Sequence, residues 1–131
     1  MKAPRLAYSR ALAALDPEAI VSCMTDDVVI TVAVHDAPMA GKEVARCLCG
    51  VLQDELEQLA LSDELIEDDS AVVLFETQIR GKAAQGLTVA RLNGDGQVRE
   101  LTVFFRPLES LQLIAEVVGA RMAAQFGALG D

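Results

Sequence analysis

The chain has 131 residues, of which 52% are hydrophobic, so it is long and apolar enough to bury a core of its own. Its net charge of −9, with 11 scattered Lys and Arg residues, disfavours nucleic acid and anionic membrane surfaces as partners. No apolar run reaches the length of a membrane span, and the N-terminus lacks the continuous apolar segment of a signal peptide. We therefore expect a single cytoplasmic domain over residues 1–131.

The first part of the chain predicts two helices and a strand. Arg5 to Leu15 is rich in Ala and Leu, which favour a helix. Asp16 and Pro17 then start a second, short helix, because Asp is a good N-cap and Pro fits the first turn. Val28 to Val34 is almost entirely β-branched and predicts a strand, and His35 to Gly41 predicts a loop.

The middle of the chain predicts a long helix, an acidic connection and a second strand. From Gly41 to Ala60 apolar residues recur at helical spacing, and Val44, Leu48 and Val51 are expected to face a sheet. Ser62 to Ser70 predicts a solvated connection, because it lacks the central glycine and alternating spacing of a calcium loop. Ala71 to Arg80 alternates between apolar and polar residues and predicts a strand with a distinct inner side.

The stretch from Gly86 to Pro107 predicts a β-hairpin. The turn Asn-Gly-Asp-Gly at residues 93–96 tolerates positive φ and is flanked by β-branched and aromatic residues. A turn centred on Gly94 and Asp95 would place Leu92 opposite Gln97, Ala90 opposite Arg99 and Thr88 opposite Leu101. One face then carries Thr88, Ala90, Leu101, Val103 and Phe105, and the other carries Leu87, Val89, Glu100, Thr102 and Phe104. Both faces are largely apolar, so we expect both to be covered.

The last segment, Leu108 to Phe126, predicts a final helix with an apolar side. The whole order is helix, helix, strand, helix, at least three strands and a helix. Consecutive hairpins leave no room for parallel crossovers, so the sequence predicts the α+β class with a mainly antiparallel sheet.

This order resembles the nuclear transport factor 2-like superfamily, and the SnoaL-like branch with its ketosteroid isomerase and polyketide cyclase fold is the most similar. The resemblance covers roughly residues 5–107. It is carried by TDDVVI after a short helix, PMAGKEV at the start of the long helix, and RLNGDGQVRELTVFFRP near the end. It implies a cone-shaped, bent sheet wrapped by the N-terminal helices and one long helix, an apolar cavity, and homodimers formed through the outer face of the sheet.

The resemblance also indicates which catalytic groups are missing. Val32 stands where the steroid isomerases would have their general base, Thr88 where they would have a protonated aspartic acid, and Ala11 where they would have the oxyanion tyrosine. Steroid isomerisation needs a base and two neutral donors, so this chain lacks its machinery. The cyclases use an acidic residue in the cavity, and the last strand offers only Glu100, which is expected on the opposite face from Thr88.

Few other side chains suggest chemistry. His35, the only histidine, is a weak candidate for a catalytic base, with a loop residue at the cone mouth as the alternative. Arg99 either binds an anionic group at the rim or pairs with an acidic neighbour. Cys23, Cys47 and Cys49 have neither redox nor zinc spacing and are expected to be reduced, buried thiols. We expect no metal site, because the one histidine would have to recruit carboxylates from elsewhere. We also expect no cofactor, since no phosphate-binding loop or dinucleotide fingerprint is present.

The functional expectation is an apolar cavity that binds a lipid-, terpene- or polyketide-like molecule, oriented by hydrogen bonds from Thr77 or Thr88. The alternative is a cyclase- or isomerase-type enzyme that uses unrecognised groups such as His35. The ligand-binding residues expected to line the cavity are Val32, Leu48, Phe75, Thr77, Thr88, Leu101, Val103 and Phe105. They are expected to be joined there by Ile30, Val34, Val73 and Ile79.

Overall fold

The computed structural model describes residues 3–126, and its elements follow the predicted order with two additional strands, β2 and β3. The α+β class is confirmed, and the final helix has the predicted bounds. None of the described helices is long and apolar enough to cross a membrane. The elements are α1 (Ala7–Ala14), α2 (Pro17–Ser22), β1 (Met24–Val32), β2 (Met39–Ala40), α3 (Lys42–Glu55), β3 (Leu56–Glu67), β4 (Ser70–Ile79), β5 (Lys82–Leu92), β6 (Val98–Arg106) and α4 (Leu108–Phe126).

The six described strands form one sheet in the order β2-β1-β6-β5-β4-β3. Neighbouring strands are antiparallel except for β1 and β6, which run parallel. The expectation that hairpins would exclude parallel pairs was wrong for these two strands. Between them the chain passes through α3 and then through β3, β4 and β5, which alternate in direction, so β6 returns beside β1 in the same direction.

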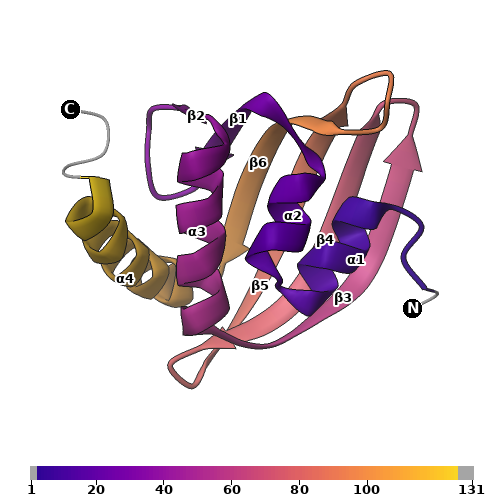
Figure 1. Ribbon diagram of the computed structural model, residues 1–131. Helices are drawn as coiled ribbons and strands as arrows, with labels where there is room; N and C mark the ends of the chain where they lie inside the picture. The colour runs from indigo at the N-terminus through magenta and orange to yellow at the C-terminus, as the bar shows by residue number, and fades with distance from the viewer. Residues whose placement is uncertain (1–2, 127–131) are drawn as a thin grey trace.

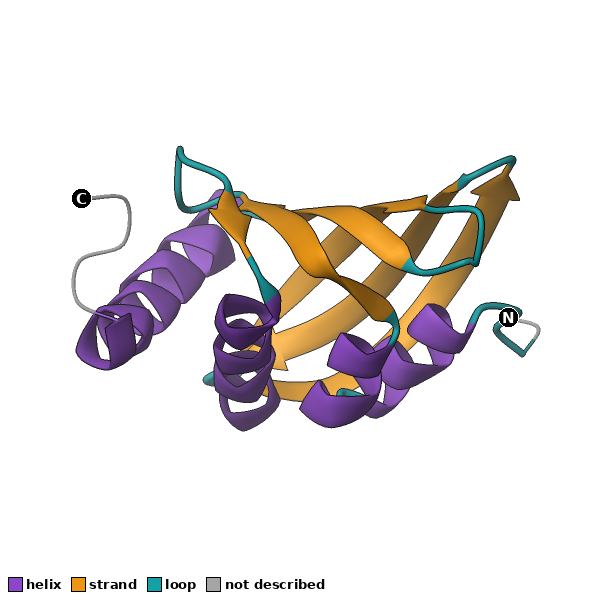
Figure 2. Cartoon of the chain, turned by 45° about the horizontal axis from the view of Figure 1, so that its top comes forward, coloured by secondary structure: helices purple, strands orange, loops and turns teal. Residues whose placement is uncertain are grey.

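Helices α1, α2 and α3 lie on one face of the sheet (Figure 1), and Figure 2 shows the sheet bending around them. We call this the concave face and the opposite side the outer face. The core lies between the concave face and the helices, where Ile30 of β1, Val73 of β4 and Ala45 of α3 are fully buried. Helix α4 packs against α3 and buries Met122 there. None of the described helices covers the outer face, and Phe104 of β6 remains 48% exposed on it.

The two N-terminal helices meet at Leu15 and Asp16. Leu15 has φ 49°, a left-handed conformation that ends α1. The Asp16 carboxylate accepts hydrogen bonds from the backbone N–H groups of Glu18 at 3.1 Å and Ala19 at 3.3 Å, as expected of an N-cap. This tight junction folds α2 back beside α1 over the concave face (Figure 1).

The long helix is shorter than predicted, and the residues after it form an edge strand. Helix α3 ends at Glu55, and Leu56 is already extended with φ −86° and ψ 140°. The segment from Ser62 to Ser70, predicted as a solvated connection, lies mostly in β3 and pairs with β4. Two register shifts in β3 interrupt the alternation that marks a strand, which is why the leucine spacing near Leu59 was misread as helical.

The predicted β5–β6 hairpin is present, but its register differs from the prediction by two residues. Thr88 lies opposite Val103 rather than Leu101. The carboxamide oxygen of Asn93 accepts two backbone N–H groups of the turn, and Gly96 has φ 79°. This turn holds one residue more than the tight turn that we expected.

A second register shift in the hairpin cancels the effect of the extra turn residue on which face each side chain occupies. The register shifts again between Arg91 and Leu92, which leaves Arg99 outside the regular pairing. A shift of one residue exchanges the two faces of a strand, whereas two such shifts restore them. The predicted division of the hairpin into a concave and an outer face is therefore correct despite the wrong register.

Gly86 of β5 makes room for an aromatic ring. It lies opposite Phe75 of β4 on one side and Phe105 of β6 on the other. A Cβ atom added to Gly86 would lie 2.4 Å from Cζ of Phe75, so this ring covers the glycine backbone. The two rings meet edge to face with centroids 5.7 Å apart. The missing side chain thus allows two aromatic rings from non-adjacent strands to touch across β5.

We expect Gly86→Ala to lower the free energy of unfolding by about 1–3 kcal/mol, because overpacking a buried contact has this cost. Urea denaturation followed by circular dichroism measures the change. Gly94→Ala is the matched control, since an added Cβ there meets nothing within 4 Å, and it should stay within about 0.5 kcal/mol of the parent. Equal losses in both variants would contradict the role of the ring contact.

Candidate functional site

A closed apolar cavity lies between the concave face and helices α1, α2 and α3. Its volume is about 40 Å³. The space is therefore closer to the roughly 10–15 Å³ that one water needs than to the roughly 300–1,000 Å³ of a typical ligand pocket. Its walls are almost entirely apolar; they include Leu12 of α1, Leu48 and Leu52 of α3, and Phe75 and Phe105 of the sheet.

Two hydroxyl groups face each other in this cavity. The phenol of Tyr8 on α1 donates a hydrogen bond of 3.1 Å to Oγ1 of Thr88 on β5, and both residues are at most 3% exposed. Two hydroxyls carry two protons, and this hydrogen bond uses one of them. No other hydrogen bond of either side chain is found among the described residues, so one O–H donor remains for an occupant of the cavity.

Burial raises the pKa of the Tyr8 phenol well above its ordinary value, although the hydrogen bond with Thr88 acts in the opposite direction. Tyr8 is therefore a neutral hydrogen-bond donor at physiological pH and not a base. The sequence interpretation missed this residue. The available signal was its position as the only tyrosine of the chain, in line with Leu12 and Leu15 on the buried side of α1.

Most of the predicted ligand-binding residues line the cavity, but two do not. Thr77 donates its hydroxyl proton to the backbone carbonyl of Glu57 at 2.7 Å and does not contact the cavity. Val32 and Val34 line a different pocket, and Val73 and Ile79 are buried in the core without facing the cavity. That the residues at the cavity bind a ligand stays a prediction. These residues are Leu48, Phe75, Thr88, Leu101, Val103 and Phe105.

A second pocket of about 180 Å³ opens between the end of β1, the loop after it, α3 and α4. We call it the mouth pocket. Leu48 lines both the mouth pocket and the closed cavity, and no other described residue does. The wall of the mouth pocket combines the apolar side chains of Val32, Met39 and Val118 with the imidazole of His35.

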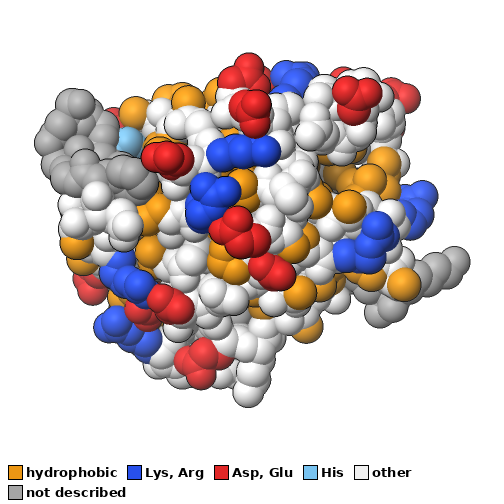
Figure 3. Space-filling model, viewed as in Figure 1, with side chains coloured by type: hydrophobic (Ala, Val, Ile, Leu, Met, Phe, Trp, Pro, Cys, Tyr) orange, Lys and Arg blue, Asp and Glu red, His pale blue; other side chains and the backbone are white. Residues whose placement is uncertain are grey.

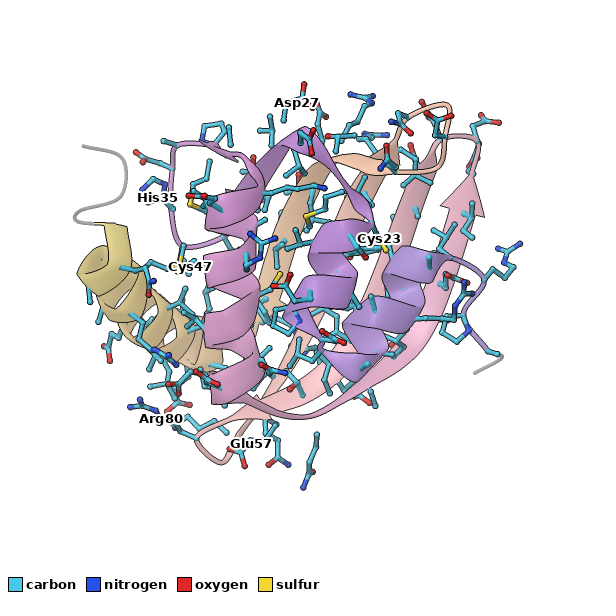
Figure 4. The ribbon with its side chains drawn as sticks, viewed as in Figure 1. Cys23, Asp27, His35, Cys47, Glu57 and Arg80 are labelled. Atoms are coloured by element: carbon cyan, nitrogen blue, oxygen red, sulfur yellow. The ribbon has the colours of Figure 1, made fainter. Side chains whose placement is uncertain are left out.

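His35 lies on the loop that joins β1 to β2, away from Glu57 and Arg80 at the other end of the sheet (Figure 4). Its Nδ1 atom is 2.9 Å from the carbonyl oxygen of Ala37 in the same loop. The mouth pocket contains neither Tyr8 nor Thr88, so the imidazole and the two hydroxyls do not face one closed space. A catalytic role for His35 stays a prediction.

The positions that the resemblance compares with isomerase groups have no acid or base among them. Val32 lies in the mouth pocket, and Ala11 is buried on α1, one turn after Tyr8. Because residues three apart share a helix face, Tyr8 brings a phenol to the side of α1 where the comparison had placed Ala11. Glu100 is exposed, and its carboxylate lies 3.3 Å from Arg99, which confirms the acidic partner for that arginine.

The charged side chains of the described residues form several ion pairs at the surface. On the helix-covered side, basic and acidic side chains alternate (Figure 3), and Arg46 contacts Glu18 at 2.7 Å. Residues 3–126 contain no cluster of three or more side chains that could hold a metal ion. The three cysteines are free, and burial raises the pKa of the Cys49 thiol to about 12, which keeps it protonated and unreactive.

The raised pKa of Tyr8 predicts a loss of stability at high pH. Below about pH 10 the phenol is neutral in both states, whereas above it the unfolded chain releases the proton first, so the free energy of unfolding falls with rising pH. Comparing urea denaturation of the parent and Tyr8→Phe between pH 8 and 11 isolates this contribution. We expect the parent to lose more unfolding free energy with rising pH than Tyr8→Phe does. A phenol that titrates at about 10 in the folded parent would contradict the burial of Tyr8.

Comparisons with known proteins identify the fold. No protein-family model matches the chain, and no curated protein sequence matches it. A steroid Δ-isomerase from Pseudomonas aeruginosa has a TM-score of 0.81 at 23% identity, with 92% of this chain and 90% of that chain covered. A SnoaL-like protein of unknown function from Burkholderia thailandensis has a TM-score of 0.61 at 18% identity, with 77% and 90% covered.

A third structure is a hypothetical protein from Catenulispora acidiphila with a ketosteroid isomerase-like fold, in complex with trimethylamine. Its TM-score is 0.63 at 16% identity, with 85% of this chain and 90% of that chain covered. At these identities the likeness concerns the course of the backbone, and it agrees with the resemblance found in the sequence. The chain thus has the nuclear transport factor 2-like fold that SnoaL-like and ketosteroid isomerase-like proteins share.

Proposed function

We propose that the protein binds a small apolar molecule carrying one hydrogen-bond acceptor, and that Tyr8 and Thr88 supply the donor. The observation that carries this proposal is the surplus O–H group of the Tyr8–Thr88 pair inside an otherwise apolar cavity. A hydroxyl with no acceptor in such surroundings is unfavourable, and a carbonyl oxygen of a ligand would relieve it. A carboxylate is a poor occupant, because none of the described side chains that line this cavity is cationic and could offset its desolvation.

The size of the space limits the ligand. The closed cavity and the mouth pocket together stay below the roughly 300 Å³ at which pockets for drug-sized molecules begin. Leu48 is the only described residue common to both, so a rotation of its side chain would join them. We therefore favour a compound smaller than the terpenes and polyketides that the sequence suggested, entering beside His35 and reaching Tyr8 past Leu48.

Binding is favoured over turnover by the chemistry of the walls. Tyr8 and Thr88 donate hydrogen bonds, but the closed cavity contains no acidic or histidine side chain that could remove a proton from carbon. A cyclase or isomerase activity would have to use His35 from the mouth pocket. If such an activity is found, His35→Ala should lower kcat by about 10²-fold or more for a general base, and leave it nearly unchanged for a loop residue.

A cytoplasmic location also stays a prediction.

The binding proposal is tested with a matched pair of probes, cyclohexanone and methylenecyclohexane, which differ in whether an oxygen or a CH2 group is attached to the ring. Because Tyr8 donates its proton to Thr88, the O–H group left for a ligand is that of Thr88, and we expect Thr88→Val to weaken cyclohexanone binding by about 2–10-fold, the worth of one neutral hydrogen bond, and to leave methylenecyclohexane unchanged. Chemical-shift titration measures both affinities. Leu48→Ala should strengthen both by enlarging the space, whereas Leu108→Ala, at a residue 68% exposed, should change neither.

Several outcomes would contradict this proposal. Equal effects of Thr88→Val on the two probes would show that the Thr88 hydroxyl does not bind the acceptor. Thermal stabilisation by small anions and by no apolar compound would show that the cavity is not the binding site.

We further propose that the protein forms a homodimer through the outer face of the sheet. Phe104 is 48% exposed there, beside half-buried Leu74 and Leu87, and these side chains border a shallow hollow of about 220 Å³. An exposed apolar patch on a sheet that no helix covers favours a protein contact. A partner sheet on this face would bury an interface of standard size, roughly 800 Å² per subunit.

Phe104→Glu should convert such a dimer to a monomer, because it would bury a carboxylate in each copy of the interface. Light scattering at micromolar concentration measures the mass of both proteins. Leu65→Glu provides a control, since Leu65 is 60% exposed and lies on the edge strand β3 away from the patch. A parent protein that is monomeric at these concentrations would overturn the proposal.

A further inference from the structure

One carboxylate, that of Glu64, lies on the concave side of the edge strand β3, where its side chain is only 5% exposed. It accepts hydrogen bonds from the backbone N–H groups of Arg5 at 2.8 Å and Leu6 at 3.1 Å, and Nε of Arg5 lies 3.8 Å away. These contacts join residues 58 and 59 positions apart in the chain. Glu64 therefore ties the start of α1 to the edge of the sheet.

This tie replaces a cap that α1 does not have. Leu6 occupies the N-cap position of α1, and no side chain of the helix itself caps it. The first N–H groups of a helix have no partner within the helix and carry a partial positive charge, which an acidic side chain stabilises. An eight-residue helix has little stability of its own, so its position depends on such contacts.

Tyr8 lies two residues after Leu6 on the same helix, and its phenol reaches Thr88 across the cavity. Helix α1 is thus held by polar contacts at two points, by Glu64 at its start and by Thr88 through Tyr8. In Figure 1 the helix lies over the part of the sheet that contains β3 and β4. Release of the first contact would free the end of the helix that carries the phenol.

The groups around Glu64 favour its ionised form. Arg5 faces the carboxylate, and Arg10 on α1 is turned toward the carbonyl oxygens of Pro4 and Arg5. The buried Ser9 hydroxyl faces the carboxylate without the geometry of a full hydrogen bond. On the strand side, Asp63 and Glu67 of β3 are exposed, and the cross-strand neighbour on β4 is Val73.

Burial alone would raise the pKa of Glu64. The hydroxyl of Ser9, the two backbone N–H groups and the charge of Arg5 outweigh this effect and hold the pKa below its ordinary value. The folded protein therefore prefers the charged carboxylate more strongly than the unfolded chain does. This contribution to stability is present above the ordinary glutamate pKa and is lost as the pH falls through the lower value of the folded state.

We infer that Glu64 is a positioning residue for Tyr8: its ionised carboxylate fixes α1 over the cavity, and loss of that charge frees α1 and exposes the phenol. Protonation of Glu64 would thus loosen the helix that lies over the cavity. The inference gains its functional meaning from the proposed ligand site, but the position of Tyr8 can be tested without any ligand.

The test uses Tyr8 as its own reporter, because the chain contains one tyrosine and no tryptophan. Near-ultraviolet absorbance follows ionisation of the phenol, and acrylamide quenching of tyrosine fluorescence follows its exposure. We expect Glu64→Gln to shift the titration of Tyr8 down toward its ordinary value of about 10 and to increase quenching at pH 7. Glu67→Gln removes the same charge from an exposed position on the same strand and should change neither signal.

Glu64→Asp keeps the charge on a shorter side chain and should restore part of the protection from quenching. A Glu64→Gln variant that is folded by circular dichroism and shields Tyr8 as well as the parent does would overturn the inference. If Glu64→Gln does not fold, acid titration of the parent decides instead. Exposure of Tyr8 at a higher pH than the loss of the circular dichroism signal supports a local release of α1, and coincidence of the two transitions overturns it.

These results separate this inference from the proposed ligand site. Failure of cyclohexanone to bind, with a Tyr8 signal that responds to Glu64, refutes the ligand and leaves the positioning role intact. Acceptor-dependent binding with a Tyr8 signal that ignores Glu64 refutes the positioning role alone.

Discussion

The sheet side of the cavity depends on the contact of Phe75 and Phe105 across Gly86. β4 and β6 are not neighbours in the sheet, and only a strand without a side chain at that point lets their aromatic rings meet over it. The two rings line the cavity on the side of the sheet, while α1, α2 and α3 cover it on the other side. The cavity is what remains between these layers, so its floor is set by the sheet and its size by how far the helices approach.

Much of this architecture follows from the sequence, because the hydrophobic periodicities of the helices, of β1, of β4 and of the hairpin are regular. The acidic edge strand was not foreseen. Its register shifts remove the alternation, and a run of Asp and Glu resembles a solvated loop until pairing with β4 is known. The hairpin shows the converse, since two unforeseen shifts cancelled and left the faces as predicted.

The site was harder to predict than the fold. Phe75, Thr88 and Leu101 could be placed in the cavity, because alternation alone fixes which side of a strand faces inward. Tyr8 and Glu64 could not, since their roles depend on where a short helix docks on a sheet formed far along the chain. No local pattern records such a contact, and both residues belong to segments whose sequences suggest other roles: an Ala-rich helix and an acidic connection.

A chain can have the fold of the ketosteroid isomerase-like proteins and lack groups that steroid isomerisation needs. Isomerisation beside a carbonyl needs a donor for the oxygen and a base for the carbon, and these are independent groups on different elements. Here a donor survives in the pair of Tyr8 and Thr88, whereas Val32 stands where the resemblance would place a base. The proposed binding of a carbonyl compound needs only the donor, because the hydrogen bond and the apolar walls act in the ground state. Among residues 3–126, the closed cavity has a hydrogen-bond donor in its hydroxyl pair and no acidic or histidine side chain beside it.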